Sequence, residues 1–131
     1  MPIDNQLIEE AKQARENAVA PFSKYKVGAA LRTKSGKVYR GCNVENCTYA
    51  LTVCAERVAL LTALAAGERE FTEIAVVTQS ETPGTPCGPC RQLMWEYCGD
   101  IDVAIANLDG KRIDYKLSTL FPHPFSFKLE E

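Results

Sequence analysis

The chain has 131 residues, of which 46% are hydrophobic and 24% are charged, and its formal net charge is −2. These values predict one folded domain spanning residues 1–131, and they argue against disorder and against a nucleic-acid partner, which a basic surface would attract. No apolar run approaches the roughly 18 residues of a membrane span, and the acidic N-terminal segment does not resemble a signal peptide, so we expect a cytoplasmic protein with no membrane partner.

The first third of the chain is predicted to form a helix followed by a hairpin. Apolar residues recur at helical spacing over residues 7–19, and Pro21 then ends the run. Residues 27–33 and 38–44 are rich in β-forming side chains and are joined by a short turn. They should therefore pair as an antiparallel hairpin.

The rest of the chain alternates helices and strands. A second helix is expected from Cys54 to the glycine stop signal at Gly67. Further elements are a strand at 74–78, a helix at 88–98, strands at 103–106 and 113–115, and one helical turn in the tail at 118–131. The turn at 107–111 is too short for a parallel crossover, so the last two strands should be antiparallel.

Three of the six cysteines stand at predicted helix starts: Cys54 opens the second helix, and Cys87 and Cys90 open the third. Helix N-termini favour the thiolate that a metal requires, so these three side chains are candidates to converge on one ion. Three protein ligands leave an open position, which is the pattern of a catalytic zinc.

The other three cysteines offer a competing interpretation, a closed structural site with four thiolates. Cys98 is placed two turns along the third helix, Cys42 in a strand and Cys47 in a loop, so we expect them to be packing or surface residues. No role is assigned to them.

A carboxylate accompanies the predicted metal ligands. Glu56 follows Cys54 by two residues and is a candidate to move protons beside the open metal position. Together, Cys54-Ala55-Glu56 and the segment 86–90, Pro-Cys-Gly-Pro-Cys, match the three-cysteine form of the zinc deaminase signature.

The sequence closely resembles the cytidine deaminases, specifically the small homotetrameric type that acts on free nucleosides. Beyond the metal motifs, the similarity covers residues 21–25, 27–31, 41–46 and 91–92. It implies a three-layer α/β/α sandwich with a mixed five-stranded sheet, and hydrolytic deamination of cytidine and deoxycytidine in pyrimidine salvage. It also implies one Zn²⁺ per subunit and a homotetramer with its active sites at subunit interfaces.

The resemblance also assigns residues to the nucleoside. It implies that Asn43 and Glu45 bind the ribose hydroxyls, and that the backbone N–H of Ala55 and the side chain of Glu56 read the pyrimidine edge. Three aromatic residues are placed near the substrate by the same resemblance: Tyr25, Tyr49 and Phe125, the last supplied across a subunit interface.

The mechanism that the resemblance implies begins with a zinc-activated water attacking C4 of cytosine. Glu56 takes the proton from this water, delivers it to N3 and later protonates the departing amine. Arg57 is expected to donate to the thiolates, which would drain charge from the sulfurs and restore the Lewis acidity of the metal.

Two departures from the family pattern leave alternatives open. Pro89 makes the third helix begin with Cys-Gly-Pro-Cys, which is also a thioredoxin-like redox motif, although its late position and the Cys54-Ala55-Glu56 segment oppose that interpretation. Tyr25 stands where the family usually has Phe, which adds a hydroxyl that needs a partner. The only histidine, His123, is expected at the surface.

Three other functions compete with cytidine deamination. Deaminases of nucleic acids usually have one His and two Cys ligands and parallel last strands. Blasticidin-type deaminases share the three-cysteine site but lack the complete pair formed by Asn43 and Glu45. A structural zinc module would bind metal without turnover.

Overall fold

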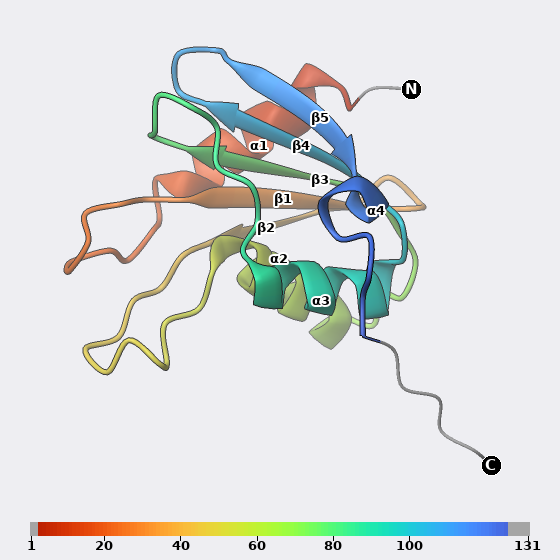
Figure 1. Cartoon of the computed structure of the whole chain (residues 1–131), viewed down its shortest axis with the longest axis horizontal. Helices are drawn as coiled ribbons and strands as arrows, with labels where there is room; N and C mark the ends of the chain where they lie inside the picture. The colour runs from red at the N-terminus through yellow and green to blue at the C-terminus, as the bar shows by residue number, and fades with distance from the viewer. Residues whose placement is uncertain (1–2, 126–131) are drawn as a thin grey trace.

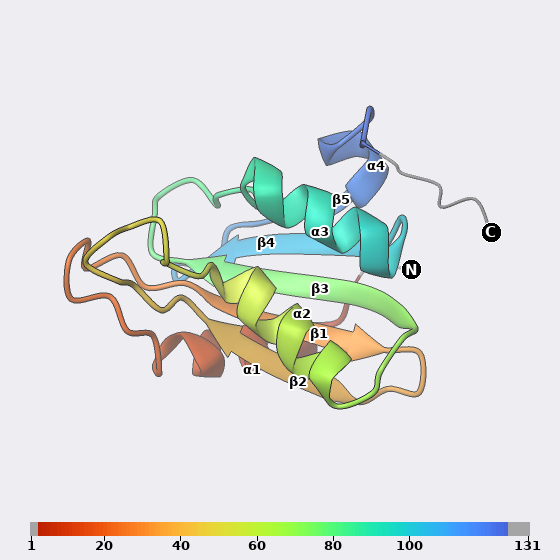
Figure 2. The same ribbon diagram turned by 90° about the horizontal axis from the view of Figure 1, so that it is seen from below.

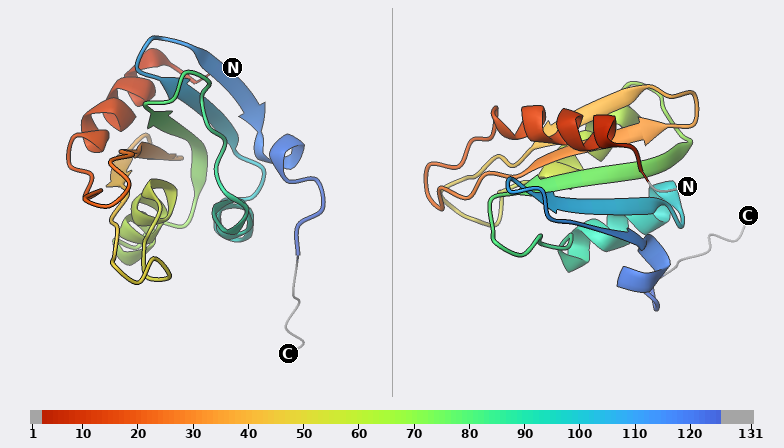
Figure 3. Two further views of the ribbon diagram at one scale, coloured as in Figure 1. Left: turned by 60° about the vertical axis from the view of Figure 1, so that its left-hand side comes forward. Right: turned by 90° about the horizontal axis from the view of Figure 1, so that it is seen from above.

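The computed structural model describes residues 3–125 and is built on a five-stranded sheet with the order β2-β1-β3-β4-β5. The strands are β1 (Gly28–Thr33), β2 (Val38–Cys42), β3 (Phe71–Thr78), β4 (Asp102–Asn107) and β5 (Arg112–Lys116). The helices are α1 (Asn5–Arg15), α2 (Ala55–Ala65), α3 (Gly88–Cys98) and α4 (Leu117–Leu120). Helix α1 covers one face of the sheet and α2 and α3 cover the other, which confirms the three-layer α/β/α prediction (Figure 1, Figure 3).

The sheet is mixed, as predicted. Strand β1 pairs antiparallel with β2 and β3, β3 runs parallel to β4, and β4 and β5 are antiparallel. The central strand β3 begins at Phe71, three residues before its predicted start. Its early residues Thr72 and Glu73 are polar and partly accessible, so they fall outside the continuous apolar pattern that marks a buried strand.

The first helix is shorter than predicted. It begins where Asp4 accepts a hydrogen bond from the backbone N–H of Leu7, a standard N-cap, but it ends at Arg15 instead of running to Val19. Val19 instead forms a parallel bridge with Val44, with hydrogen bonds to the flanking residues Asn43 and Glu45. Tertiary pairing of this β-branched residue outweighs the helical periodicity, so this helix boundary was predicted wrongly.

Helix α2 lies directly on β2 because Gly41 has no side chain. A Cβ atom at position 41 would lie 2.3 Å from the carbonyl oxygen of Ala55 and 2.4 Å from the backbone nitrogen of Ala59. Such distances are far below van der Waals contact, so only glycine permits this approach. The contact fixes the first turn of α2, and with it the position of Cys54 and Glu56.

Several structural features that carry polar groups gather at one end of the sheet. The parallel strands β3 and β4 end here, and helices α2 and α3 begin here. The loops around residues 17–27 and 43–54 lie at the same end (Figure 2). The carboxyl ends of parallel strands are where α/β proteins commonly bind ligands. In residues 3–125, no helix combines the length and the apolar character needed to cross a membrane.

Candidate active site

Two helix N-termini supply the three candidate metal ligands. Cys54 is the N-cap residue of α2 and Cys87 is the N-cap residue of α3, each with an extended backbone and no side-chain capping bond. Cys90 lies in the first turn of α3 and is fully buried. Pro89 occupies this first turn too, where its missing N–H removes no helical hydrogen bond, so the departure from the family pattern leaves the helix intact.

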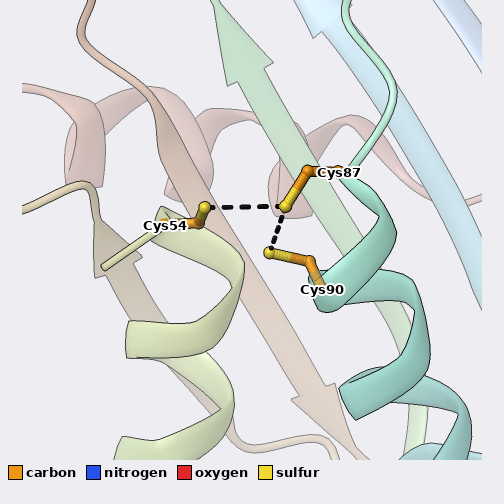
Figure 4. Close-up of side chains that lie close together, drawn as sticks. All are labelled: Cys54, Cys87 and Cys90. Atoms are coloured by element: carbon orange, nitrogen blue, oxygen red, sulfur yellow. Dashed lines mark hydrogen bonds between the residues drawn. The ribbon is translucent and has the colours of Figure 1, made fainter. Parts of the chain in front are cut away.

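The three sulfur atoms form one compact cluster (Figure 4). The Sγ atoms of Cys54 and Cys87 are 3.7 Å apart, those of Cys87 and Cys90 are 3.1 Å apart, and all three lie within 4.8 Å of one another. Zinc–sulfur bonds of about 2.3 Å in a tetrahedron place two sulfurs about 3.8 Å apart, so the donor set fits a zinc ion.

The cluster contains three cysteines within the described part of the chain, residues 3–125. Cys42, Cys47 and Cys98 are not members of it, which opposes the closed structural site with four thiolates. Cys54 lies beside the Cys87–Cys90 pair, and this third cysteine opposes a thioredoxin-like redox site, which needs only two. The arrangement therefore favours a metal centre with one open position.

The cluster is electrostatically prepared to hold a thiolate. A hydrogen bond from Cys90 and then the Arg57 guanidinium lower the pKa of Cys54 to about 5, against the opposing effect of burial. The same hydrogen bond and burial raise the pKa of Cys90. A metal ion must therefore displace the proton of Cys90 on binding, which makes metal affinity depend on pH.

Glu56 is buried beside the cluster, with 5% of its surface exposed. Burial raises the pKa of Glu56 to about 7, and the neighbouring Cys54 thiolate adds to the increase. A carboxyl group with a pKa near neutrality can both take up and release a proton at physiological pH. The environment of Glu56 therefore suits the proton transfer that the sequence predicts for it.

Arg57 contacts the cluster. Its Nη2 atom donates to Sγ of Cys54 over 3.4 Å and to the carbonyl oxygen of Thr52 over 3.3 Å. Its Nε atom is buried and has no hydrogen-bond partner among the described residues. The guanidinium is thus held against the sulfur from within the first turn of α2.

A cavity of about 230 Å³ opens next to the cluster. Its lining comes from α2, from the end of β3, and from the loops before β1, before α2 and before α3. The lining residues are Tyr25, Val27, Asn43, Thr52, Cys54, Ala55, Glu56, Val76, Thr78, Gly84, Thr85 and Cys87. The cavity therefore joins two of the candidate metal ligands, the buried carboxylate and several polar groups in one space.

The predicted ribose pair occupies two different positions. Asn43 lines the cavity, and its side-chain amide binds the backbone of the loop before β1. Oδ1 accepts from the N–H of Val27 at 2.9 Å, and Nδ2 donates to the carbonyl of Tyr25 at 2.7 Å. Glu45 is outside the lining and accepts hydrogen bonds from the backbone N–H groups of Phe22 and Ser23 at 3.0 and 3.1 Å. Hydrogen bonds from Ser23 and Phe22 lower the pKa of Glu45.

The three predicted aromatic residues also differ in position. Tyr25 lines the cavity, whereas Tyr49 and Phe125 do not and are 71% and 70% exposed. Tyr49 has a φ of 58° and its ring meets that of Phe22 edge-on, with centroids 6.2 Å apart. The backbone of Phe125 is tied to α3 by two hydrogen bonds with the side-chain amide of Gln92. His123 is exposed, as predicted.

Several polar lining residues were missed by the sequence analysis. Thr78 is the last residue of β3, and Thr85 precedes the Cys87 helix. For Thr78 the available signal was positional, since a polar residue at the carboxyl end of a buried strand commonly faces the ligand site of an α/β sheet.

This fold and this site define a class: an α/β/α protein with a three-thiol centre for zinc at two helix starts and a buried carboxylate beside it. Residues 1–106 match the family described as "Cytidine and deoxycytidylate deaminase zinc-binding region". The match spans most of the chain, so the protein belongs to the cytidine and deoxycytidylate deaminase family.

Individual relatives agree with this assignment. A cytidine deaminase of Halalkalibacterium halodurans is 49% identical over 121 residues, covering 92% of each chain. A crystal structure of cytidine deaminase from Burkholderia pseudomallei superimposes with a TM-score of 0.91 and 49% identity, covering 94% of this chain and 99% of that one. A blasticidin-S deaminase of Bacillus cereus is 32% identical over 130 residues, again covering 92% of each chain.

Proposed function

We propose that this protein is a zinc-dependent hydrolase that converts cytidine and deoxycytidine to uridine and deoxyuridine with release of ammonia. One observation carries the proposal: Cys54, Cys87 and Cys90 converge beside the buried carboxylate of Glu56 at a cavity that is also lined by polar side chains. The 49% identity to the cytidine deaminase of Halalkalibacterium halodurans, against 32% to the blasticidin-S deaminase, supports the nucleoside over the antibiotic.

Zinc held by the three thiolates would supply Lewis acidity, which lowers the pKa of water from 15.7 toward about 7. Glu56 takes one proton of the attacking water and passes it to N3 of the ring as the oxygen–carbon bond forms at C4. It then takes the second proton, from the new C4 hydroxyl, and delivers it to the amino group as the carbon–nitrogen bond breaks, so water and cytidine become uridine and ammonia. The pKa of Glu56, about 7, suits both directions of proton transfer.

Arg57 acts through the metal ligands. Its hydrogen bond to Cys54 withdraws charge from the sulfur, and this offsets the net negative charge of three thiolates on one divalent ion. We assign Arg57 as a positioning residue because it contacts the thiolate, not the substrate.

Substrate binding is assigned to the residues around the cavity. Asn43 and Glu45 would bind the ribose hydroxyls, and the N–H of Ala55 with Glu56 would read the pyrimidine edge. The remaining assigned contacts are aromatic: Tyr25 in the cavity wall, Tyr49 in the loop before α2, and Phe125 supplied across a subunit interface.

The assembly we propose is a homotetramer of single-domain subunits with one zinc each, acting in cytoplasmic pyrimidine salvage. The cavity volume of about 230 Å³ is below the 300–1,000 Å³ usual for small-molecule sites, which supports a second subunit that completes the site. The exposed apolar residues Phe22, Tyr49 and Leu51 near this end of the sheet suit such an interface. The net charge of −2 gives no support to a nucleic-acid partner.

The test is the ultraviolet absorbance of cytidine mixed with the zinc-loaded protein, with Glu56→Gln as the inactive variant. The matched control is Glu96→Gln, which changes an exposed carboxylate on α3. Conversion by the wild type and by E96Q but not by E56Q supports the proposal. A folded, zinc-loaded wild type that leaves cytidine unchanged would contradict it, and turnover of blasticidin S alone would favour the antibiotic reaction.

A further inference from the structure

Three hydroxyl groups form a chain along one wall of the cavity. The Oγ atom of Ser80 lies 3.0 Å from Oη of Tyr25 and 3.0 Å from Oγ1 of Thr78. Tyr25 and Thr78 line the cavity, whereas Ser80 is not part of the lining. Tyr25 lies in the loop before β1 and Thr78 ends β3, so Ser80 joins two segments that are distant in the sequence.

The directions of these hydrogen bonds follow from counting protons. A serine hydroxyl carries one proton, and that of Ser80 is donated to the carbonyl oxygen of Thr82 over 2.8 Å. Ser80 can therefore only accept from Tyr25 and Thr78, which must each donate their own proton to it. After this donation, the oxygens of Tyr25 and Thr78 retain only acceptor lone pairs.

We propose that Tyr25 and Thr78 are specificity-determining residues that present hydrogen-bond acceptors, and no donors, to a hydroxyl or amino group of the substrate, with Ser80 as the positioning residue that fixes this polarity. The inference rests on the proposed function, because cytidine carries donors of this kind on its sugar and its base. If a ligand offered only acceptors at this wall, its acceptor would face an acceptor of Tyr25 or Thr78 with no proton between them. Leaving both groups without a donor weakens binding.

The backbone at Tyr25 is held independently of the tyrosine hydroxyl. Its backbone carbonyl accepts from Nδ2 of Asn43, and the backbone of the neighbouring Lys24 and Lys26 is bonded to the side-chain amide of Gln79 at 3.3 and 3.4 Å. Oε1 of Gln79 is in turn held by Arg15 at 2.7 Å. Replacing tyrosine with phenylalanine should therefore remove one acceptor from the wall while leaving the backbone in place.

The experiment measures KM and kcat for cytidine with zinc-loaded wild type, Tyr25→Phe, Ser80→Ala and Ser80→Thr. We expect Y25F to raise KM by about three- to tenfold with kcat within about twofold, as the loss of one hydrogen bond predicts. S80A should raise KM by a smaller factor, because the two hydroxyls are then free to rotate, and S80T should restore the wild-type value because it keeps the hydroxyl.

Each outcome is decisive. If Y25F keeps the wild-type KM while the wild type is active, the acceptor wall does not touch the substrate and the inference is wrong. If Y25F raises KM but S80A does not, Ser80 does not position the wall. Lower unfolding temperatures without a change in KM would assign the hydroxyl chain to stability alone. If zinc-loaded wild type does not convert cytidine, the proposed function itself fails, and this inference fails with it.

Discussion

Nη2 of Arg57 donates to Sγ of Cys54 over 3.4 Å, so a positive group is held against a candidate metal ligand from one turn along the same helix. The same nitrogen also donates to the carbonyl of Thr52, which fixes the direction of the guanidinium. Hydrogen bonds to metal ligands orient them and tune their charge, and their loss commonly lowers metal affinity by about 10–100-fold.

We therefore expect Arg57→Ala to weaken zinc binding by about tenfold or more and to lower kcat/KM. The measurement is competition with a chromogenic zinc chelator, followed by kinetics at saturating zinc. Arg69→Ala is the matched control, since Arg69 follows α2 and, within residues 3–125, makes exposed hydrogen bonds to the backbone carbonyls of Leu64 and Glu68 alone. Equal zinc affinity in R57A and R69A would exclude Arg57 from the metal centre.

The close contact at Gly41 makes a prediction about stability. A methyl group at this position would collide with backbone atoms of α2, which cannot move aside as a flexible side chain can. We expect Gly41→Ala to lower the free energy of unfolding by at least about 2 kcal/mol, measured by urea denaturation of the zinc-loaded protein.

Gly88→Ala is the control for this prediction. Apart from its two chain neighbours, nothing described lies within 4 Å of a Cβ atom at Gly88, which is the first residue of α3. Pro89 follows it and disfavours the helical backbone for a preceding residue with a Cβ atom, so G88A should lose some stability but clearly less than G41A. An equal loss of stability in both variants would show that the contact between β2 and α2 is not the cause.

Local patterns were sufficient to predict most of the fold. The helices beginning at Ala55 and Gly88 carry their own start signals, and the antiparallel β4–β5 pair follows from a turn too short for a crossover. The end of α1 was missed because the bridge between Val19 and Val44 is a tertiary contact. Hydrophobic periodicity along one segment does not contain that information.

The carboxylate of Asp114 on β5 predicts a loss of stability in acid. Its hydrogen bonds from Arg112, at 2.7 and 2.8 Å, lower the pKa of Asp114 below the usual 3.8. A lowered pKa stabilises the folded state above pH 3.8, and this contribution disappears as the pH falls through the folded-state value. Because the side chain is 35% exposed, solvent screening limits the contribution to about 0.5 kcal/mol.

Asp114→Asn isolates this contribution. The difference in unfolding free energy between wild type and D114N should be present at pH 6 and should shrink as the pH falls below 3.8. Acid release of zinc affects both proteins alike and so cancels in the difference. A difference that is constant between pH 6 and pH 3 would mean that the Arg112–Asp114 pair does not carry the effect.

The candidate site was predictable where its chemistry follows from sequence spacing. Cys54, Cys87, Cys90 and Glu56 stand at helix starts, and two short motifs identify them. The hydroxyl chain through Ser80 was not predictable, because it joins the loop before β1 to the end of β3 by side-chain contacts. Such contacts depend on tertiary packing, for which no short sequence pattern exists.

Cys98 allows a test of the cysteines outside the cluster. Burial raises the pKa of Cys98 to about 12 from the usual 9.0, so at pH 8 its reactive thiolate fraction is about a thousandfold lower than that of an ordinary thiol. Cys47 is exposed and should react first when the zinc-loaded protein is treated with iodoacetamide and the modified peptides are quantified by mass spectrometry. Unfolding in urea should make the two thiols equally reactive, since it abolishes the burial of Cys98. Labelling of Cys98 in the folded protein within about tenfold of the rate at Cys47 would contradict a protonated, protected thiol.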